Sequence, residues 1–134
     1  MPDPAENLEL NEHLPRLVGT AEDSGGPYVE FLLEKPGSGT RRRSSKYMEW
    51  PACEKIEPLS EFLPDMWQFG AIHVPNSRLE SLVHSLRGHA DKANRGELAL
   101  EERSSAAVAE ACRALADWIS KRDPRGTGLQ IFGI

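Results

Sequence analysis

The chain has 134 residues, of which 39% are hydrophobic and 28% are charged, and its net charge is -5. This length suits a single domain that buries roughly two-thirds of its unfolded surface, and the Trp, Phe and Tyr content argues against global disorder. The acidic balance excludes proteins that bind nucleic acid or anionic lipid non-specifically, since both activities need a net cationic face.

Residues 1–26 are predicted to form a partly ordered acidic arm that precedes a single domain over residues 27–134. Leucines with helical spacing flank Pro15, but a proline costs a helix interior about 3 kcal/mol, so we expect a short docked turn. The sequence contains neither a signal-peptide pattern nor an apolar stretch of membrane-spanning length. This indicates a cytoplasmic protein that does not contact a membrane.

Two alternating segments predict a β-hairpin over residues 28–53. The first runs from Tyr28 to Lys35 and the second from Lys46 to Cys53, so about ten residues connect them. This connection is longer than a usual hairpin loop and is expected to project from the sheet. Each strand places alternate apolar side chains on one face, namely Val29, Phe31 and Leu33 in the first and Met48, Trp50 and Ala52 in the second.

The next segment, Glu54–Phe69, contains Pro58 and Pro64 and is expected to form only short helical turns. Two further short strands are predicted near residues 71–74 and 129–132, where apolar runs are bounded by Pro or Gly.

Two helices are predicted over about 77–94 and about 98–121. Ser77 and Glu80 match a capping box at the start of the first, and Gly96 is a suitable stop after it. Both helices carry an apolar stripe. The order of elements predicts an α+β fold, with a small antiparallel or mixed sheet and both helices on one of its faces. The strand order stays open.

No arrangement of residues predicts catalysis, a metal or a cofactor. The four histidines lack the i, i+4 spacing of a helical metal site. Cys53 is a weak candidate for a thiol nucleophile, because proline and acids flank it and a reactive thiol needs a nearby cation or a helix N-terminus. Cys112 falls on the apolar side of its helix and is expected in the core.

The sequence suggests two contact surfaces. The first is the arginine loop, residues 41–46, where four bases and no acid interrupt the acidic chain. Its guanidinium groups are suited to carboxylates or phosphates, and the alternative is a solvated loop that protects a sheet edge from aggregation. The bases are Arg41, Arg42, Arg43 and Lys46.

The second surface is the aromatic segment, residues 62–69. Aromatic and Met side chains are typical of the residues that dominate protein interfaces, and the alternative is that they complete the core. The residues concerned are Phe62, Met66, Trp67 and Phe69.

The leading interpretation is a non-catalytic cytoplasmic protein-interaction module, such as an adaptor, an inhibitor or an immunity-like binder, that uses the arginine loop, the aromatic segment or both. A homodimer through the sheet edges or the aromatic segment is compatible with it. The first alternative is a nucleic-acid-associated protein that contacts phosphates through Arg41–Arg43, and the second is an enzyme with an unrecognised site.

Overall fold

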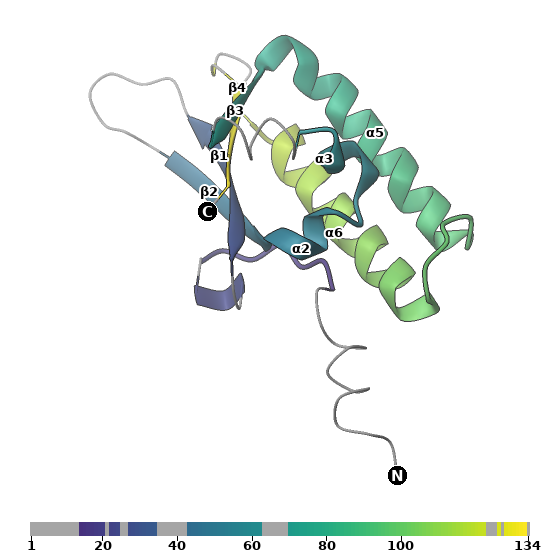
Figure 1. Cartoon of the computed structure of the whole chain (residues 1–134). Helices are drawn as coiled ribbons and strands as arrows, with labels where there is room; N and C mark the ends of the chain where they lie inside the picture. Colours follow the sequence, from purple (N-terminus) through teal and green to yellow (C-terminus); the bar gives the residue numbers. More distant parts are fainter. Residues whose placement is uncertain are drawn as a thin grey trace.

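A four-stranded antiparallel sheet with two long helices on one face forms the body of the protein, which confirms the predicted α+β class (Figure 1). The computed structural model describes residues 14–20, 22–24, 27–34, 43–62, 70–122, 126 and 128–133. The strands are β1 (Tyr28–Glu34), β2 (Arg43–Glu49), β3 (Ala71–Pro75) and β4 (Gly128–Gly133), in the order β2-β1-β4-β3. The helical elements are η1 (Glu22–Ser24), α2 (Trp50–Cys53), α3 (Glu57–Ser60), α5 (Asn76–Asn94) and α6 (Glu102–Ser120).

Strand β1 is central and pairs with both β2 and β4. Its predicted apolar face is buried, with Val29 and Phe31 only 1% exposed and Leu33 6% exposed. These side chains join the core between the sheet and the helices. Leu32 is also buried, although strand alternation places it on the opposite face of the sheet.

The predicted second strand is shifted, because β2 begins at Arg43 and ends at Glu49. At its start, Ser45 pairs with β1, and its hydroxyl donates to Glu30 Oε2 at 2.8 Å. At its end, the N–H of Trp50 donates to the carbonyl of Pro27 at 2.7 Å. Pro51 has no N–H with which to extend the ladder, and its fixed φ suits the first turn of a helix. The hairpin predicted to reach residue 53 therefore stops at residue 49, and the chain continues as α2.

The two short strands are confirmed as β3 and β4. Strand β4 lies between β1 and β3, so the last segment of the chain occupies the middle of the sheet. All three strand pairings are antiparallel, which removes the mixed alternative.

Helix α5 begins at Asn76, directly after Pro75, whose φ of -63° and ψ of 152° give it the N-cap conformation. Ser77 consequently lies inside the first turn, and no side chain caps the helix. The predicted capping box is therefore wrong. The proline at the end of β3 sets the helix start two positions earlier than an N-cap at Ser77 requires.

Gly96 ends α5 as expected, with a φ of 69°. Its N–H donates to the carbonyl of Ala93 at 3.2 Å, and the N–H of Glu97 donates to the carbonyl of Lys92 at 3.0 Å. This pair of bonds is the Schellman arrangement, which needs a residue in the left-handed region at that position.

Replacing Gly96 with alanine should lower the free energy of unfolding by about 1 kcal/mol, because a Cβ disfavours the left-handed region. Urea titration followed by circular dichroism checks this. Gly19 is exposed, with open space around its Cβ position and no positive φ. A Gly19→Ala variant should lose no stability, and an equal loss in both variants would contradict the explanation.

Helix α6 begins at Glu102, later than the predicted residue 98, because Gly96–Glu101 turns the chain between the two helices. The predicted apolar face is buried except for Trp118, which is half-buried against the core. Arg122 joins the two helices, since it donates to Asn76 Oδ1 and, at 3.1 Å, to the carbonyl of Ile119. No helix in the described part of the chain is long and apolar enough to cross a membrane.

Part of the N-terminal segment lies against the sheet. Val18 and Tyr47 exchange two backbone hydrogen bonds of 2.9 and 2.8 Å at the outer edge of β2. Pro15 is buried, and Leu17 packs on the core. Residues 1–13 lie outside the described part of the chain.

Candidate functional site

The arginine loop falls mostly outside the described residues. Arg41 and Arg42 are not described, and Arg43 is the first residue of β2, opposite Glu34. Lys46 lies within β2 opposite Phe31 and is half-buried. It therefore belongs to a strand rather than to the tip of a connection.

The aromatic segment is described only at its start. Phe62 follows α3 and is half-buried against the core, whereas Met66, Trp67 and Phe69 lie outside the described residues. Phe62 also lines a cavity that Lys46 does not reach. Within the described chain, the two predicted surfaces therefore do not form one site.

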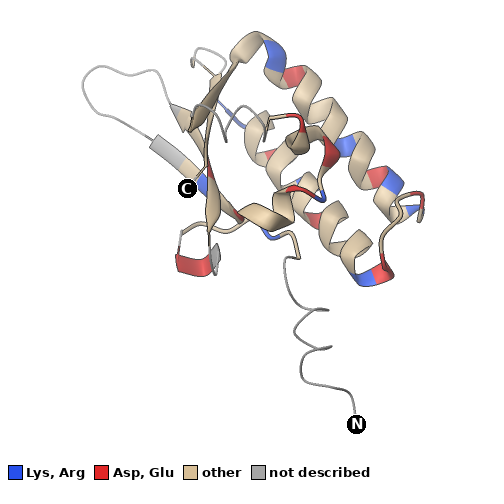
Figure 2. Cartoon of the chain, viewed as in Figure 1, with Lys and Arg blue, Asp and Glu red and all other residues tan. Residues whose placement is uncertain are grey.

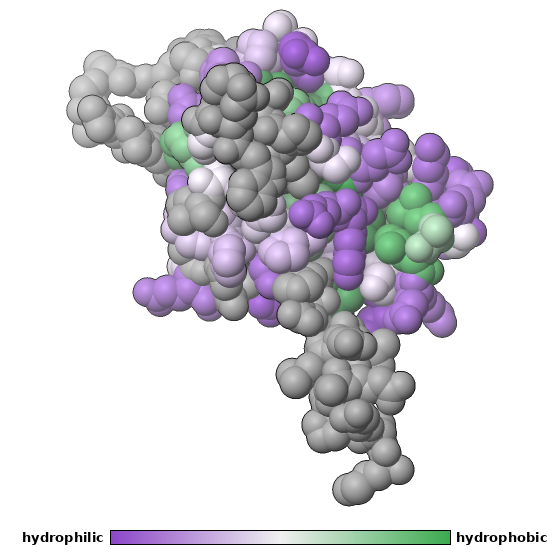
Figure 3. Space-filling model, in the orientation of Figure 1, coloured by the Kyte–Doolittle hydropathy of each residue, from purple (hydrophilic) through white to green (hydrophobic). Residues whose placement is uncertain are grey.

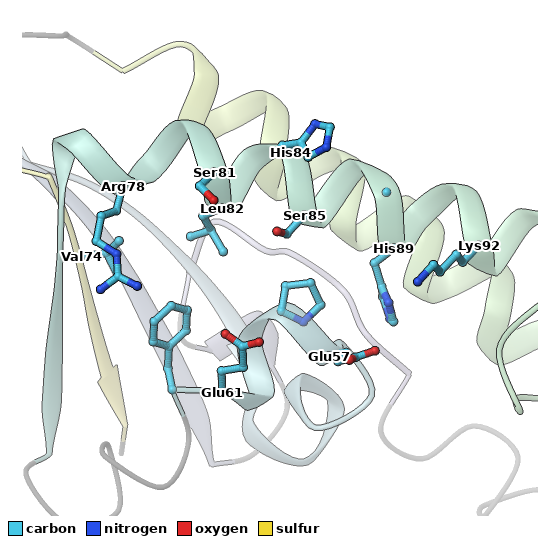
Figure 4. Close-up of a pocket in the computed structure, with 13 residues that line it drawn as sticks. Glu57, Glu61, Val74, Arg78, Ser81, Leu82, His84, Ser85, His89 and Lys92 are labelled. Atoms are coloured by element: carbon cyan, nitrogen blue, oxygen red, sulfur yellow. The ribbon is translucent and has the colours of Figure 1, made fainter.

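This cavity is a groove of about 390 Å³ between α3 and α5, which we call the α3–α5 groove (Figure 4). One wall comes from α3 and the two residues after it, including Glu57, Glu61 and Phe62. The other wall comes from one stripe of α5, and its members recur at intervals of three and four residues, which places them on one side of a helix. This stripe consists of Arg78, Ser81, Ser85, Gly88 and Lys92.

The charges of α5 divide between two sides of the helix. Three of its five charged residues form ion pairs of 3.2 to 3.8 Å with α6 or the residue just beyond its end. These pairs join Arg87 to Asp117, Asp91 to Arg113 and Glu80 to Arg122. The other two, Arg78 and Lys92, line the groove, and neither side chain forms an ion pair or hydrogen bond with a described residue.

The α3 wall is acidic, and its carboxylates also lack ion-pair partners among the described residues. Glu57 and Glu61 are exposed, and their carboxylates have no ion-pair partner among the described residues. Red and blue segments mark the acids of the α3 region and the alternating charges of α5 (Figure 2). Two cations and two anions thus line one groove without neutralising each other.

The surface around the groove is polar. The visible face over α5 is mostly hydrophilic, and a clear apolar patch lies at the end where the chain turns from α5 to α6 (Figure 3). Leu98 and Leu100 of that turn pack partly against the core. Charged and polar side chains therefore outnumber apolar ones in the lining of the groove.

Two histidines line the groove in different ways. His89 is 7% exposed, and its Nε2 lies 3.4 Å from the carbonyl oxygen of Lys55, so it helps to hold the segment before α3. His84 is exposed, and its ring points away from the cavity (Figure 4). Among the described residues, no three His, Cys, Asp or Glu side chains gather closely enough to hold a metal ion.

Gly88 is an unexpected residue on the α5 wall. A Cβ added there would meet no atom within 4 Å, and the backbone of Gly88 is ordinary helix. Glycine in a helix interior is less stable than alanine by about 0.5–1 kcal/mol. The fold gives no reason for glycine at this position, and the missing side chain keeps the wall of the groove low.

We expect Gly88→Ala to raise the free energy of unfolding by about 0.5–1 kcal/mol, because alanine is the better helix former and has room for its methyl group. Chemical denaturation measures the change. Gly96→Ala is the matched control, since the same substitution at the end of the same helix should destabilise. A loss of stability in Gly88→Ala would show that glycine serves the fold.

The two cysteines are free thiols in the core, and Cys53 is 1% exposed. Burial raises the pKa of Cys53, and the nearby charges of Glu54 and Glu49 raise it further. Burial raises the pKa of Cys112 from 9.0 to about 12. Both thiols are therefore protonated at neutral pH, which removes the structural basis for a thiolate nucleophile at Cys53.

Neither thiol should react with iodoacetamide at pH 8 while the chain is folded, and both should react in denaturant. Mass spectrometry reads the number of adducts. Because folding raises these pKa values, the stabilisation from protonated thiols is complete below the unfolded value of 9.0 and is lost toward about pH 12 for Cys112. Rapid labelling of the folded protein at pH 8 would contradict this description of the core.

The sequence did not reveal the α3–α5 groove. The stripe from Arg78 to Lys92 is the polar side of an amphipathic helix, and such a side normally faces only water. The available signal was the run of small residues between two cations, at Ser81, Ser85 and Gly88. Comparison of the chain with protein-family models, with curated proteins and with solved structures gave no match.

Proposed function

We propose that this protein is a non-catalytic interaction module that binds a protein partner in the α3–α5 groove. The observation that carries the proposal is the division of charge on α5. Its three other charged residues are paired with α6 or the residue after it, whereas Arg78 and Lys92 point to a shared cavity without a partner in the described chain. Unpaired charges that converge on a groove are available to a ligand, and complementary charges steer specific association.

A protein partner fits the groove better than a nucleic acid. The carboxylates of Glu57 and Glu61 would repel phosphates, while they can receive basic side chains or backbone N–H groups. Phe62 is half-exposed in the same groove, so the start of the aromatic segment would belong to the contact surface. The proposal gives Lys46 and the arginine loop no necessary part in binding.

The lining does not favour a hydrolytic enzyme. A serine nucleophile needs a hydrogen bond to a base, and within the described residues no hydrogen bond links Ser81 or Ser85 to either histidine of the groove. Two free cysteines fit a reducing compartment, so we place the protein in the cytoplasm.

The experiment is an affinity capture from the source cells with three forms of the full chain. The first is the natural sequence, the second carries Arg78→Ala with Lys92→Ala, and the third carries Arg87→Ala with Arg113→Ala as a control of equal charge change. Partners that bind in the groove should be captured by the first and third forms and lost with the second. Identical partner lists from all three forms, or equal loss with the control, would overturn the proposal.

A further inference from the structure

The length of the groove limits what can occupy it. Arg78 and Lys92 lie fourteen residues apart on one side of α5, which corresponds to about 21 Å along the helix axis. An α-helix bonds its backbone N–H and C=O groups internally, whereas an extended chain leaves them free to meet the polar wall of the groove. At about 3.3 Å per residue, six or seven residues cover the distance.

The charges follow an order along the groove. Arg78 lies at one end and Lys92 at the other, and Glu61 and Glu57 extend from the opposite wall between them (Figure 4). Arginine binds carboxylates with two parallel hydrogen bonds, and lysine binds them as a compact charge. A complementary chain therefore carries acidic groups near both ends and a basic group in its middle.

The middle of the α5 wall suits a peptide backbone. Ser81 and Ser85 offer hydroxyl groups that can donate to backbone carbonyls or accept from backbone N–H groups. Beside them, Gly88 has open space in place of a side chain, so a main chain can approach the helix closely there. Together with the charge order, these positions make the groove a channel for an extended segment.

We infer that the α3–α5 groove binds an extended segment of about six or seven residues from the partner, with acidic side chains near its ends and a basic side chain between them. This inference rests on the proposed function, because it specifies what that same groove takes. It names the charge pattern by which the partner is recognised.

A displayed library of random twelve-residue peptides, selected on the immobilised full chain and read by sequencing, tests the inference. Enriched peptides should carry Asp or Glu at two positions about six residues apart with Lys or Arg between them. Arg78→Glu should replace the acidic preference at one end with a basic one, and Lys92→Glu should do so at the other end. Arg103→Glu, at an exposed position of α6 outside the groove, should leave the pattern unchanged.

The Gly88→Ala variant tests binding in the groove without changing any charge. It should reduce the enrichment of the selected peptides at least about tenfold, because a methyl group occupies the point of closest approach. The same variant is expected to be at least as stable as the natural chain, so a fall in binding could not come from unfolding.

The selection distinguishes binding in the α3–α5 groove from recognition of the acid–base–acid order. Enriched peptides that lose binding in the Gly88→Ala or charge variants but lack the acid–base–acid order would overturn the inference and leave the groove as the binding site. Absence of enrichment, or enrichment that no groove variant affects, would overturn both the inference and the proposed function.

Discussion

Replacing Gly128 with alanine is expected to lower the free energy of unfolding by about 3 kcal/mol, since backbone strain and overpacking each cost about 1–3 kcal/mol. Gly128 begins β4 with a φ of 133°, a region that L side chains rarely adopt. An added Cβ would collide with the carbonyl oxygen of Val74 and would lie 3.0 Å from the backbone nitrogen of Asn76. These atoms belong to the junction of β3 and α5 and cannot move without disturbing both.

Urea unfolding of Gly128→Ala beside Gly19→Ala measures this effect. The control replaces an exposed glycine that has open space around it, so it should retain the natural stability. A loss below about 1 kcal/mol in Gly128→Ala would be within the range of an ordinary surface substitution and would contradict the close approach of β3 and β4 at this position.

The double variant Arg78→Glu with Lys92→Glu is expected to weaken binding of a selected peptide by about 100-fold, because each substitution replaces an attraction with a repulsion in the groove. Isothermal titration calorimetry gives the dissociation constants. The effect should diminish at high salt, since both side chains are exposed.

The control for this variant is Arg103→Glu with Lys121→Glu, which changes the net charge equally at exposed positions outside the groove. It should bind the peptide within a factor of about two of the natural chain, because distant exposed charges are screened. Equal weakening in both double variants would show that net charge, and not the groove, determines affinity.

Local patterns in the sequence predict much of the fold. The alternation in Val29, Phe31 and Leu33 identifies β1 because strand periodicity is a local property. Gly96 is similarly recognisable as a helix end, since its backbone conformation favours glycine. Such features need no knowledge of distant segments.

Features that depend on distant segments were not predicted. The central place of β4 results from pairing of Leu129–Gly133 with Val29–Leu33 across about a hundred residues, which no local pattern encodes. The predicted start of α5 was wrong for a local reason, because Pro75 already provides the N-cap conformation that the sequence pattern assigned to Ser77.

The α3–α5 groove could not be predicted from local sequence patterns either. Its two walls come from the segment after α2 and from α5, and nothing local in either segment indicates that they face each other. The sequence predicted a contact surface at the arginine loop because the charge of the chain is locally reversed there. The unpaired charges of Arg78 and Lys92 become visible only when the partners of Arg87, Asp91 and Glu80 are known.

Chemical-shift mapping locates the residues of the chain that contact a bound peptide. The ¹⁵N-labelled full chain is titrated with a peptide selected from the library, and the backbone amide resonances are followed. The largest shifts should occur at Ser81, Ser85 and Gly88 and across the groove at Glu57 and Glu61. Shifts concentrated on β2 around Lys46, with the α5 stripe unaffected, would contradict binding in the α3–α5 groove.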